Sequence, residues 1–153
     1  MVETSEAKPT LDELFNRHHE LIARVKELEA RIQAIRTGGT SVDPSLDELK
    51  AFTHTLVVDL NTHIHAEEDE YGRRRSELAP SSKALLDRVV FQHRALEDTL
   101  ETFLKTLSEA HAQAPDVDYN LLEMLLARAR RLRYSLRQHT ADERLLFREL
   151  QSK

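Results

Sequence analysis

The sequence contains no cysteine and no tryptophan, and it has only three glycines and four prolines among 153 residues. The absence of cysteine excludes disulfide bonds and thiolate metal ligands, and it fits a reducing compartment. The N-terminal residues are polar and acidic, and no apolar run reaches the roughly 20 residues that a membrane-spanning helix needs. We therefore expect a cytoplasmic protein that has no membrane partner.

The chain also lacks an excess of positive charge. Its formal net charge is −5, so binding to nucleic acid is not expected. Two arginine-rich stretches, residues 73–75 and 128–137, are interpreted as a solvated face or as a contact with a protein partner. A chain of this length can bury a sizeable core as one domain, and we expect a monomer or a weak homo-oligomer.

In place of these features, the sequence has four long stretches rich in Leu, Glu, Arg and Ala, which are good helix formers. Capping boxes that begin at Thr10 and Ser45 mark two of the helix starts. We predict no strands, and helices over residues 10–37, 44–72, 82–112 and 117–151. Residues 1–9 are expected to be a disordered segment that precedes a single domain over residues 10–151.

Each predicted helix carries one apolar stripe at 3.6-residue spacing. Four amphipathic helices with short connections predict an all-α fold, an antiparallel up-down-up-down four-helix bundle. On the third helix we place Leu96, Glu97, Leu100 and Leu104 on the inward stripe. Seven ionisable residues occupy stripe positions that should be buried: His18, His63, Glu67, His93, Glu97, His139 and Glu143.

Six of these residues form three pairs of the type His-x-x-x-Glu, which places an imidazole and a carboxylate one turn apart on one helix face. A single pair of this type is readily explained as a partly exposed hydrogen bond. Three pairs together with His18, one group on each helix, favour a shared site. Burying three carboxylates without a cation would cost several kcal/mol each or force them to protonate. A metal-free interaction bundle is the alternative.

The spacing of the histidines is repeated within the chain. His18 and His63 are 45 residues apart, and His93 and His139 are 46 residues apart. In an antiparallel bundle the offsets along the helices bring all seven groups to a similar level near one end. The chain is therefore interpreted as two similar helical hairpins that face each other across a site.

Four imidazoles and three carboxylates form a nitrogen and oxygen ligand set, which disfavours structural zinc. Seven ligands are too many for one ordinary transition-metal ion and suit two ions that share bridging carboxylates. We predict two iron ions, with manganese as the second choice and zinc as a contaminant. Such a site could leave a coordination position open for a small molecule such as oxygen, peroxide or nitric oxide.

The histidine and glutamate pattern resembles the hemerythrin-like, or HHE cation-binding, family over residues 10–150. The surrounding sequences HHELIARVKEL, HIHAEEDEY and HTADERLLF are part of the resemblance. It implies an oxo- or hydroxo-bridged di-iron centre with Glu67 and Glu143 as bridging carboxylates. It also implies a set of terminal ligands: His18, His63, His93 and His139.

The sequence departs from the oxygen carriers of this family at two positions. Glu97 stands where they have a second histidine on the third helix, and His139-x-x-x-Glu143 replaces their His-x-x-x-x-Asp. An added carboxylate beside the metals would stabilise ferric iron, which favours turnover over reversible oxygen binding. We expect a non-haem di-iron protein that reacts with peroxide or oxygen, with catalase-like or ferroxidase-type turnover. An oxygen, iron or nitric oxide sensing or binding module without turnover is the alternative.

Neighbours of the predicted site are assigned by helix face. Glu68 is expected to accept a hydrogen bond from a ligating imidazole. Tyr71 and Tyr134 are candidates for redox or hydrogen-bonding neighbours, although an aromatic residue on a bundle stripe is more often part of the core. The remaining histidines of the first two helices lie off the stripes and are expected on the surface: His19, His54 and His65.

Overall fold

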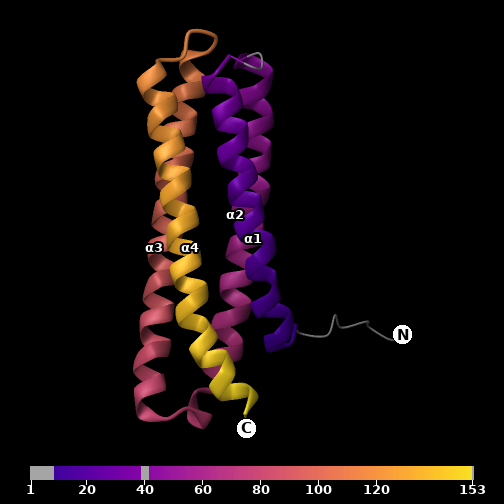
Figure 1. Cartoon of the computed structure of the whole chain (residues 1–153), viewed down its shortest axis with the longest axis vertical. Helices are drawn as coiled ribbons and strands as arrows, with labels where there is room; N and C mark the ends of the chain where they lie inside the picture. The colour runs from indigo at the N-terminus through magenta and orange to yellow at the C-terminus, as the bar shows by residue number, and fades with distance from the viewer. Residues whose placement is uncertain (1–8, 39–41, 153) are drawn as a thin grey trace, which may run out of the picture.

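The computed structural model describes residues 9–38 and 42–152, with residues 42–44 described by their backbone alone. Four long α-helices lie alongside one another (Figure 1): α1 Leu11–Arg36, α2 Val42–Arg73, α3 Pro80–Gln113 and α4 Tyr119–Gln151. A short 3-10 helix, η1 (Arg75–Glu77), connects α2 to α3. The described residues contain no strand, so the predicted all-α fold of four packed helices is confirmed. The predicted disorder concerns residues 1–9, of which residues 1–8 lie outside the described part.

The predicted helix limits agree with the structure to within two residues at every end. Thr10 caps α1 as expected, because its hydroxyl accepts a hydrogen bond from the Glu13 amide at 3.2 Å. The capping box predicted at Ser45 is wrong: α2 begins at Val42, so Ser45 lies inside the helix. Pro44 does not prevent this earlier start, since amides in the first turn have no acceptor within the helix.

The first helix ends at a glycine in the left-handed region. Gly38 has φ 77°, and its amide donates to the Ile35 carbonyl at 3.1 Å. A side chain would strain this conformation, so a glycine just beyond the last helical residue stops the helix efficiently. The connection to α2 is consequently short, which favours packing of the two helices against each other.

Each helix packs against two others: α1 and α3 both contact α2 and α4. The end of α1, the start of α2 and the α3–α4 connection lie at one end of the molecule (Figure 1). The start of α1, the end of α4 and the α2–α3 connection lie at the opposite end. The long helices therefore carry side chains from distant parts of the sequence to the same level of the interior.

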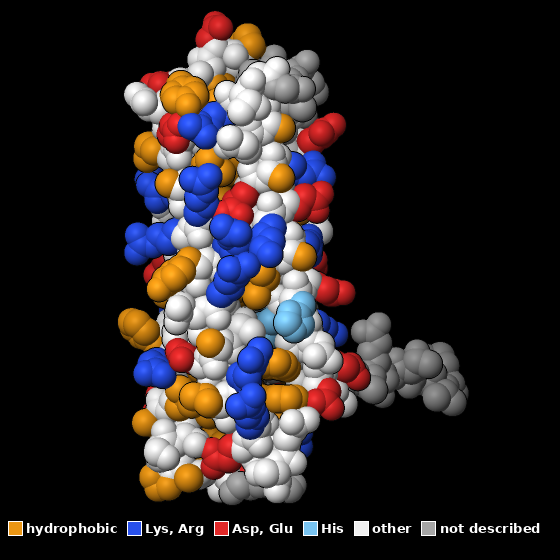
Figure 2. Space-filling view, viewed as in Figure 1, with side chains coloured by type: hydrophobic (Ala, Val, Ile, Leu, Met, Phe, Trp, Pro, Cys, Tyr) orange, Lys and Arg blue, Asp and Glu red, His pale blue; other side chains and the backbone are white. Residues whose placement is uncertain are grey.

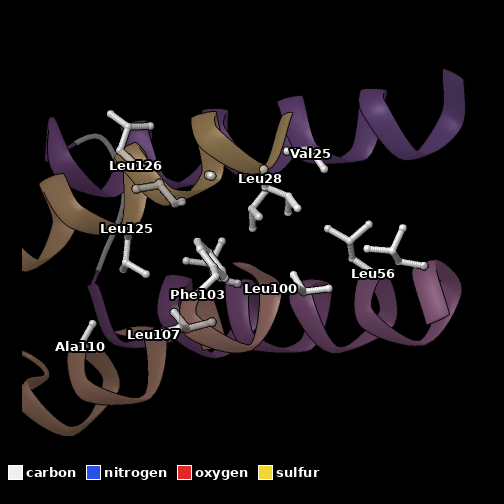
Figure 3. Packing of buried hydrophobic residues seen from close by; sticks show 14 of the residues in the cluster. Val25, Leu28, Leu56, Leu100, Phe103, Leu107, Ala110, Leu125 and Leu126 are labelled. Carbon is white, nitrogen blue, oxygen red and sulfur yellow. The ribbon is translucent and has the colours of Figure 1, made fainter. Parts of the chain in front are cut away.

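Buried positions follow alternating steps of three and four residues, the pattern of helices in left-handed bundles. On α3 the buried residues at these steps are Leu86, Val89, His93, Leu96, Leu100, Phe103, Leu107 and Ala110, and Thr106 is buried beside Leu107. Phe103 is fully buried and points into the interior with Leu28 and Leu125 (Figure 3). The sequence interpretation of Leu104 as an inward residue is therefore wrong, because Leu104 is only half-buried.

The apolar core consists of two clusters separated along the bundle. The large cluster fills the part nearer the α1–α2 and α3–α4 connections and includes Leu28, Leu56, Phe103 and Leu125. The small cluster lies at the other end and consists of Leu11, Tyr71, Leu78, Leu86, Val89, Leu146 and Leu150. The helices pass through a layer of buried polar side chains between these two clusters.

The outer faces of the helices are strongly charged. Figure 2 shows Lys and Arg side chains along the middle of the face that α1 and α4 form. Arg130, Arg131 and Arg137 are exposed, as the predicted solvated basic face requires. Within the described part of the chain, no helix combines the length and the apolar character needed to cross a membrane.

Candidate metal centre

Six of the seven predicted ligands form the buried polar layer between the two clusters. None of these residues is more than 3% exposed, and all four helices contribute: His18 from α1, His63 and Glu67 from α2, His93 from α3, and His139 and Glu143 from α4. The alternating three- and four-residue steps explain the burial, because each of these residues occupies an inward position of its helix.

The imidazoles turn the same ring nitrogen towards the centre of the layer. His18 Nε2 lies 3.1 Å from His63 Nε2, and the Nε2 atoms of His93 and His139 are 3.2 Å apart. Glu143 Oε2 lies 2.9 Å from His18 Nε2 and 3.0 Å from His139 Nε2. Glu67 Oε1 lies 3.3 Å from His18 Nε2 and also contacts His63 Nε2. Nitrogen and oxygen donors from four helices thus converge on one small volume.

These spacings, which are also hydrogen-bond distances, fit ligands arranged around an ion. Two donor atoms that each lie about 2.1 Å from a metal, at right angles, are roughly 3 Å apart. His18, Glu67, His139 and Glu143 each offer one ligand atom, and these atoms lie within 4.8 Å of one another. This buried group could hold a metal ion.

On the α3–α4 side, a chain of hydrogen bonds fixes the imidazole of His139. The Gln92 amide donates to Asp142 Oδ2 at 2.6 Å, which leaves the Gln92 oxygen facing His139 Nδ1 at 3.0 Å. Because this oxygen only accepts, His139 Nδ1 carries a proton, which leaves Nε2 as the nitrogen through which the neutral ring can bind a metal. That is the tautomer a metal ligand requires.

His93 is held in the same tautomer by Glu68. The carboxylate oxygen of Glu68 lies 3.2 Å from His93 Nδ1 and also accepts from Arg94 at 3.0 Å. Burial lowers the pKa of His93, and the neighbouring His139 lowers it further. The carboxylates of Glu67 and Glu68 oppose this shift but do not reverse it. The ring therefore favours the neutral form, which a metal ligand requires, and the predicted hydrogen bond from an imidazole of the layer to Glu68 is confirmed.

The α1–α2 side has no comparable contacts. Among the described residues, neither His18 Nδ1 nor His63 Nδ1 has a hydrogen-bond partner, although both atoms are buried. The two hairpins otherwise repeat each other, with His18 corresponding to His93 and His63 to His139. The difference arises next to the imidazoles, because Arg17 occupies the position that corresponds to Gln92.

The two carboxylates of the layer also differ. Burial raises the pKa of Glu67, but the imidazoles of His139, His18 and His63 outweigh this effect and hold the pKa well below its usual value. Glu67 Oε2 is buried without a hydrogen-bond partner in the described part of the chain. Glu143 Oε1 accepts a hydrogen bond of 2.8 Å from Tyr71. An ionised buried carboxylate oxygen without a donor is costly unless a cation lies beside it.

Of the two tyrosines predicted as neighbours of the site, Tyr71 lies beside the layer and Tyr134 does not. Tyr71 is buried beside the layer, and burial, Glu67 and Glu70 all raise its pKa, so the hydroxyl keeps its proton and donates to Glu143. Tyr134 is 65% exposed and lies on the surface. His19, His54 and His65 are exposed, as expected.

Glu97 is the one predicted ligand that does not join the layer. Its side chain is 31% exposed and forms an ion pair with Arg94 at 3.1 Å. It lines a surface cavity with Asn61 and Glu101. The physical reason is the helix register: the inward positions near His93 are Leu96 and Leu100, so a residue four positions after His93 lies beside the stripe.

Gln92 and Asp142 were not recognised in the sequence. Gln92 directly precedes a predicted ligand and Asp142 directly precedes another, so both lie next to the stripe on their helices. Their contact depends on how α3 and α4 are rotated against each other. Without that rotation, neither residue differs from the many polar residues on the helix flanks.

Comparisons of the chain with protein-family models, with curated proteins and with solved structures give no significant match. The resemblance to hemerythrin-like proteins therefore stays a prediction from the sequence pattern, and the functional interpretation depends on the geometry of the buried layer.

Proposed function

We propose that the chain is a hemerythrin-like, up-down-up-down bundle that binds two iron ions in the buried layer, with manganese as the second choice. The observation that carries this proposal is the pair of Nε2–Nε2 contacts at 3.1 and 3.2 Å. In the tautomer fixed by Gln92 and Glu68, two lone pairs face each other between His93 and His139. Such an arrangement repels unless a cation lies near both nitrogens.

The proposed ligands are the Nε2 atoms of the four histidines and the oxygens of Glu67 and Glu143. Each carboxylate offers two oxygens, so it can bridge two ions. The absence of thiolates and the mixture of imidazole with carboxylate suit iron and manganese. Bound iron would supply one-electron redox chemistry with oxygen or peroxide.

The surrounding residues keep this site in order. Gln92 and Glu68 hold the rings of His139 and His93, and Tyr71 holds one oxygen of Glu143. The large and small clusters on either side limit the entry of water from the two ends of the bundle. Fixed ligands in an apolar surrounding are what a metal centre needs to react with small molecules without losing its ion.

The preferred activity is turnover of peroxide or oxygen, catalase-like or ferroxidase-type. Two carboxylates in the layer, with a third on His93 Nδ1, give an anionic surrounding that favours the ferric state. A binding or sensing module without turnover is the second candidate. The observation that favours it is the ion pair of Glu97 with Arg94, which removes one of the expected negative charges from the layer.

The decisive experiment measures iron per chain and the ultraviolet-visible spectrum of the purified protein before and after peroxide, with an oxygen electrode in the same cell. Two irons per chain with ferric oxo-bridge bands, and oxygen released on adding peroxide, are expected for catalase-like turnover. Two irons with no release of oxygen and no oxidation of added ferrous iron would favour the binding module. A stable bundle that binds no stoichiometric metal would overturn the proposal.

A further inference from the structure

A cavity of about 260 Å³ opens between α1 and α2 and reaches the metal layer. Its lining includes Arg17, Arg24, Asp59 and His63. His63 is only 3% exposed, and its Nδ1 atom is buried with no hydrogen-bond partner among the described residues. A proposed ligand with an unpartnered polar atom therefore contributes to the lining of a space large enough for a small molecule.

The charged residues of this cavity are not equivalent. Arg24 and Asp59 form a close ion pair with each other. Arg17 is half-buried and has no hydrogen-bond or ion-pair partner within the described residues, and Glu20 is exposed at the rim. Of the two arginines that line the cavity, Arg17 is therefore the one without an ion pair among the described residues.

The second hairpin shows which side chain occupies the position equivalent to Arg17. There, the side chain that corresponds to Arg17 is Gln92, and its oxygen lies 3.0 Å from Nδ1 of His139, the counterpart of His63. Arg17 has five N–H donors and no acceptor, so it cannot accept a hydrogen bond from Nδ1–H of His63. The first hairpin thus has two donors where the second hairpin has a donor and an acceptor.

We propose that this cavity binds a small planar oxyanion, such as a carboxylate, between Arg17 and Nδ1–H of His63. The inference rests on the proposed function, because ligation of a metal through Nε2 places the proton of the neutral ring on Nδ1. A carboxylate can accept both hydrogen bonds of the guanidinium fork and still accept one from the imidazole. The anion would supply the acceptor that Gln92 supplies in the other hairpin.

The bound anion should help the protein to retain its metal. A carboxylate that accepts the second N–H of a ligating histidine orients the ring and raises its basicity, and loss of such a partner typically lowers metal affinity 10- to 100-fold. The site would therefore make metal retention on the α1–α2 side respond to the concentration of a small anion. The α3–α4 side, with Gln92 and Glu68 in place, would not respond.

The test uses the full chain loaded with iron and formate as the probe, and it measures the rate at which a chelator removes the metal. Formate should slow this rate by about tenfold in the wild-type protein. R17Q should show no response to formate and should lose metal slowly from the start, because the new amide oxygen can reach His63 as Gln92 reaches His139. R130Q removes one exposed arginine of α4 without touching the cavity, and it should respond like the wild type.

Each other outcome is informative. An equal response to formate in R17Q and in the wild type would place the anion on the metal itself and overturn the inference. Iron-loaded wild-type protein that shows no effect of formate would also overturn it, while leaving the metal centre intact. A wild-type chain that binds no iron would overturn the inference together with the proposed function. Circular dichroism of each variant before loading verifies that the bundle is folded.

Discussion

The two hairpins of this bundle place the same histidines at the same level but surround them differently. In the α3–α4 hairpin, both ring Nδ1 atoms have partners, Gln92 for His139 and Glu68 for His93. In the α1–α2 hairpin, both corresponding Nδ1 atoms are buried without partners in the described structure, and a cavity reaches His63. The hairpins therefore share the side chains that build the buried layer, and they differ in the side chains that hold its imidazoles.

Removing a proposed ligand from either hairpin should abolish metal binding, so that the two hairpins no longer differ in how they hold a metal. H139A and E67A should each lose stoichiometric metal, because each deletes a donor of the buried layer. The unfolding free energy should fall by about 3 kcal/mol, since a ligand present at 100 times its dissociation constant contributes roughly that amount. Metal analysis and urea denaturation measure both effects. H19A changes an exposed neighbouring histidine and should do neither; equal metal content in all three variants would contradict the ligand assignment.

Removing the outer contacts should affect the hairpins unequally. Q92L deletes the acceptor that holds His139 and should weaken metal binding by 10- to 100-fold. R17L changes the corresponding position of α1, where no hydrogen bond exists to be lost, and in buffers free of small anions it should change the affinity much less. Competition with a chelating dye gives both affinities. Equal losses in the two variants would show that the hairpins do not differ in the way described.

A smaller effect is expected from the tyrosine that distinguishes α2 from α4. Tyr71 corresponds to Phe147, which stacks on Phe15 at 4.8 Å between ring centroids. Y71F makes the two helices alike at this position and removes the 2.8 Å hydrogen bond to Glu143. The expected loss is about 1 kcal/mol of unfolding free energy, measured with urea. Y134F, on the surface, is the matched control and should leave the midpoint unchanged.

The smallest effect is expected at Glu97, the carboxylate that does not reach the layer. E97Q removes an exposed ion pair with Arg94, and such pairs contribute about 0.2–1 kcal/mol. Metal content per chain should therefore stay the same. A loss of metal in E97Q would restore Glu97 as a ligand and would show that α3 rotates when the ion binds.

The sequence was sufficient to predict the helices and most of the layer, because burial on a long helix follows a simple repeat. Glu67 and Glu97 show where this reasoning stops. Both lie four residues after a histidine, but His63 occupies a position from which a step of four reaches the next inward place. From His93 the next inward place is a step of three, at Leu96. The same register error explains why Leu104 was assigned to the core instead of Phe103.

The contacts that tune the layer could not be predicted for a different reason. Gln92, Asp142 and Arg17 lie on helix flanks, where the sequence shows only that a residue is polar. Whether such a side chain meets a histidine of the next helix depends on the rotation of two helices about their axes. A small rotation of one helix about its axis brings a different side chain into contact with the next helix. No local sequence pattern predicts this rotation.

We expect the separation of the apolar core into two clusters to govern how the bundle unfolds. The small cluster has far fewer buried apolar residues than the large cluster, and the polar layer lies between the two along the helices. In metal-free protein the repulsion within the layer would leave the end formed by Leu11, Leu86 and Leu150 free to open while the other end stays folded. Bound metal would join the two clusters into one cooperative unit. The chain would then report its metal content through the hydrogen exchange and protease sensitivity of one end of the bundle.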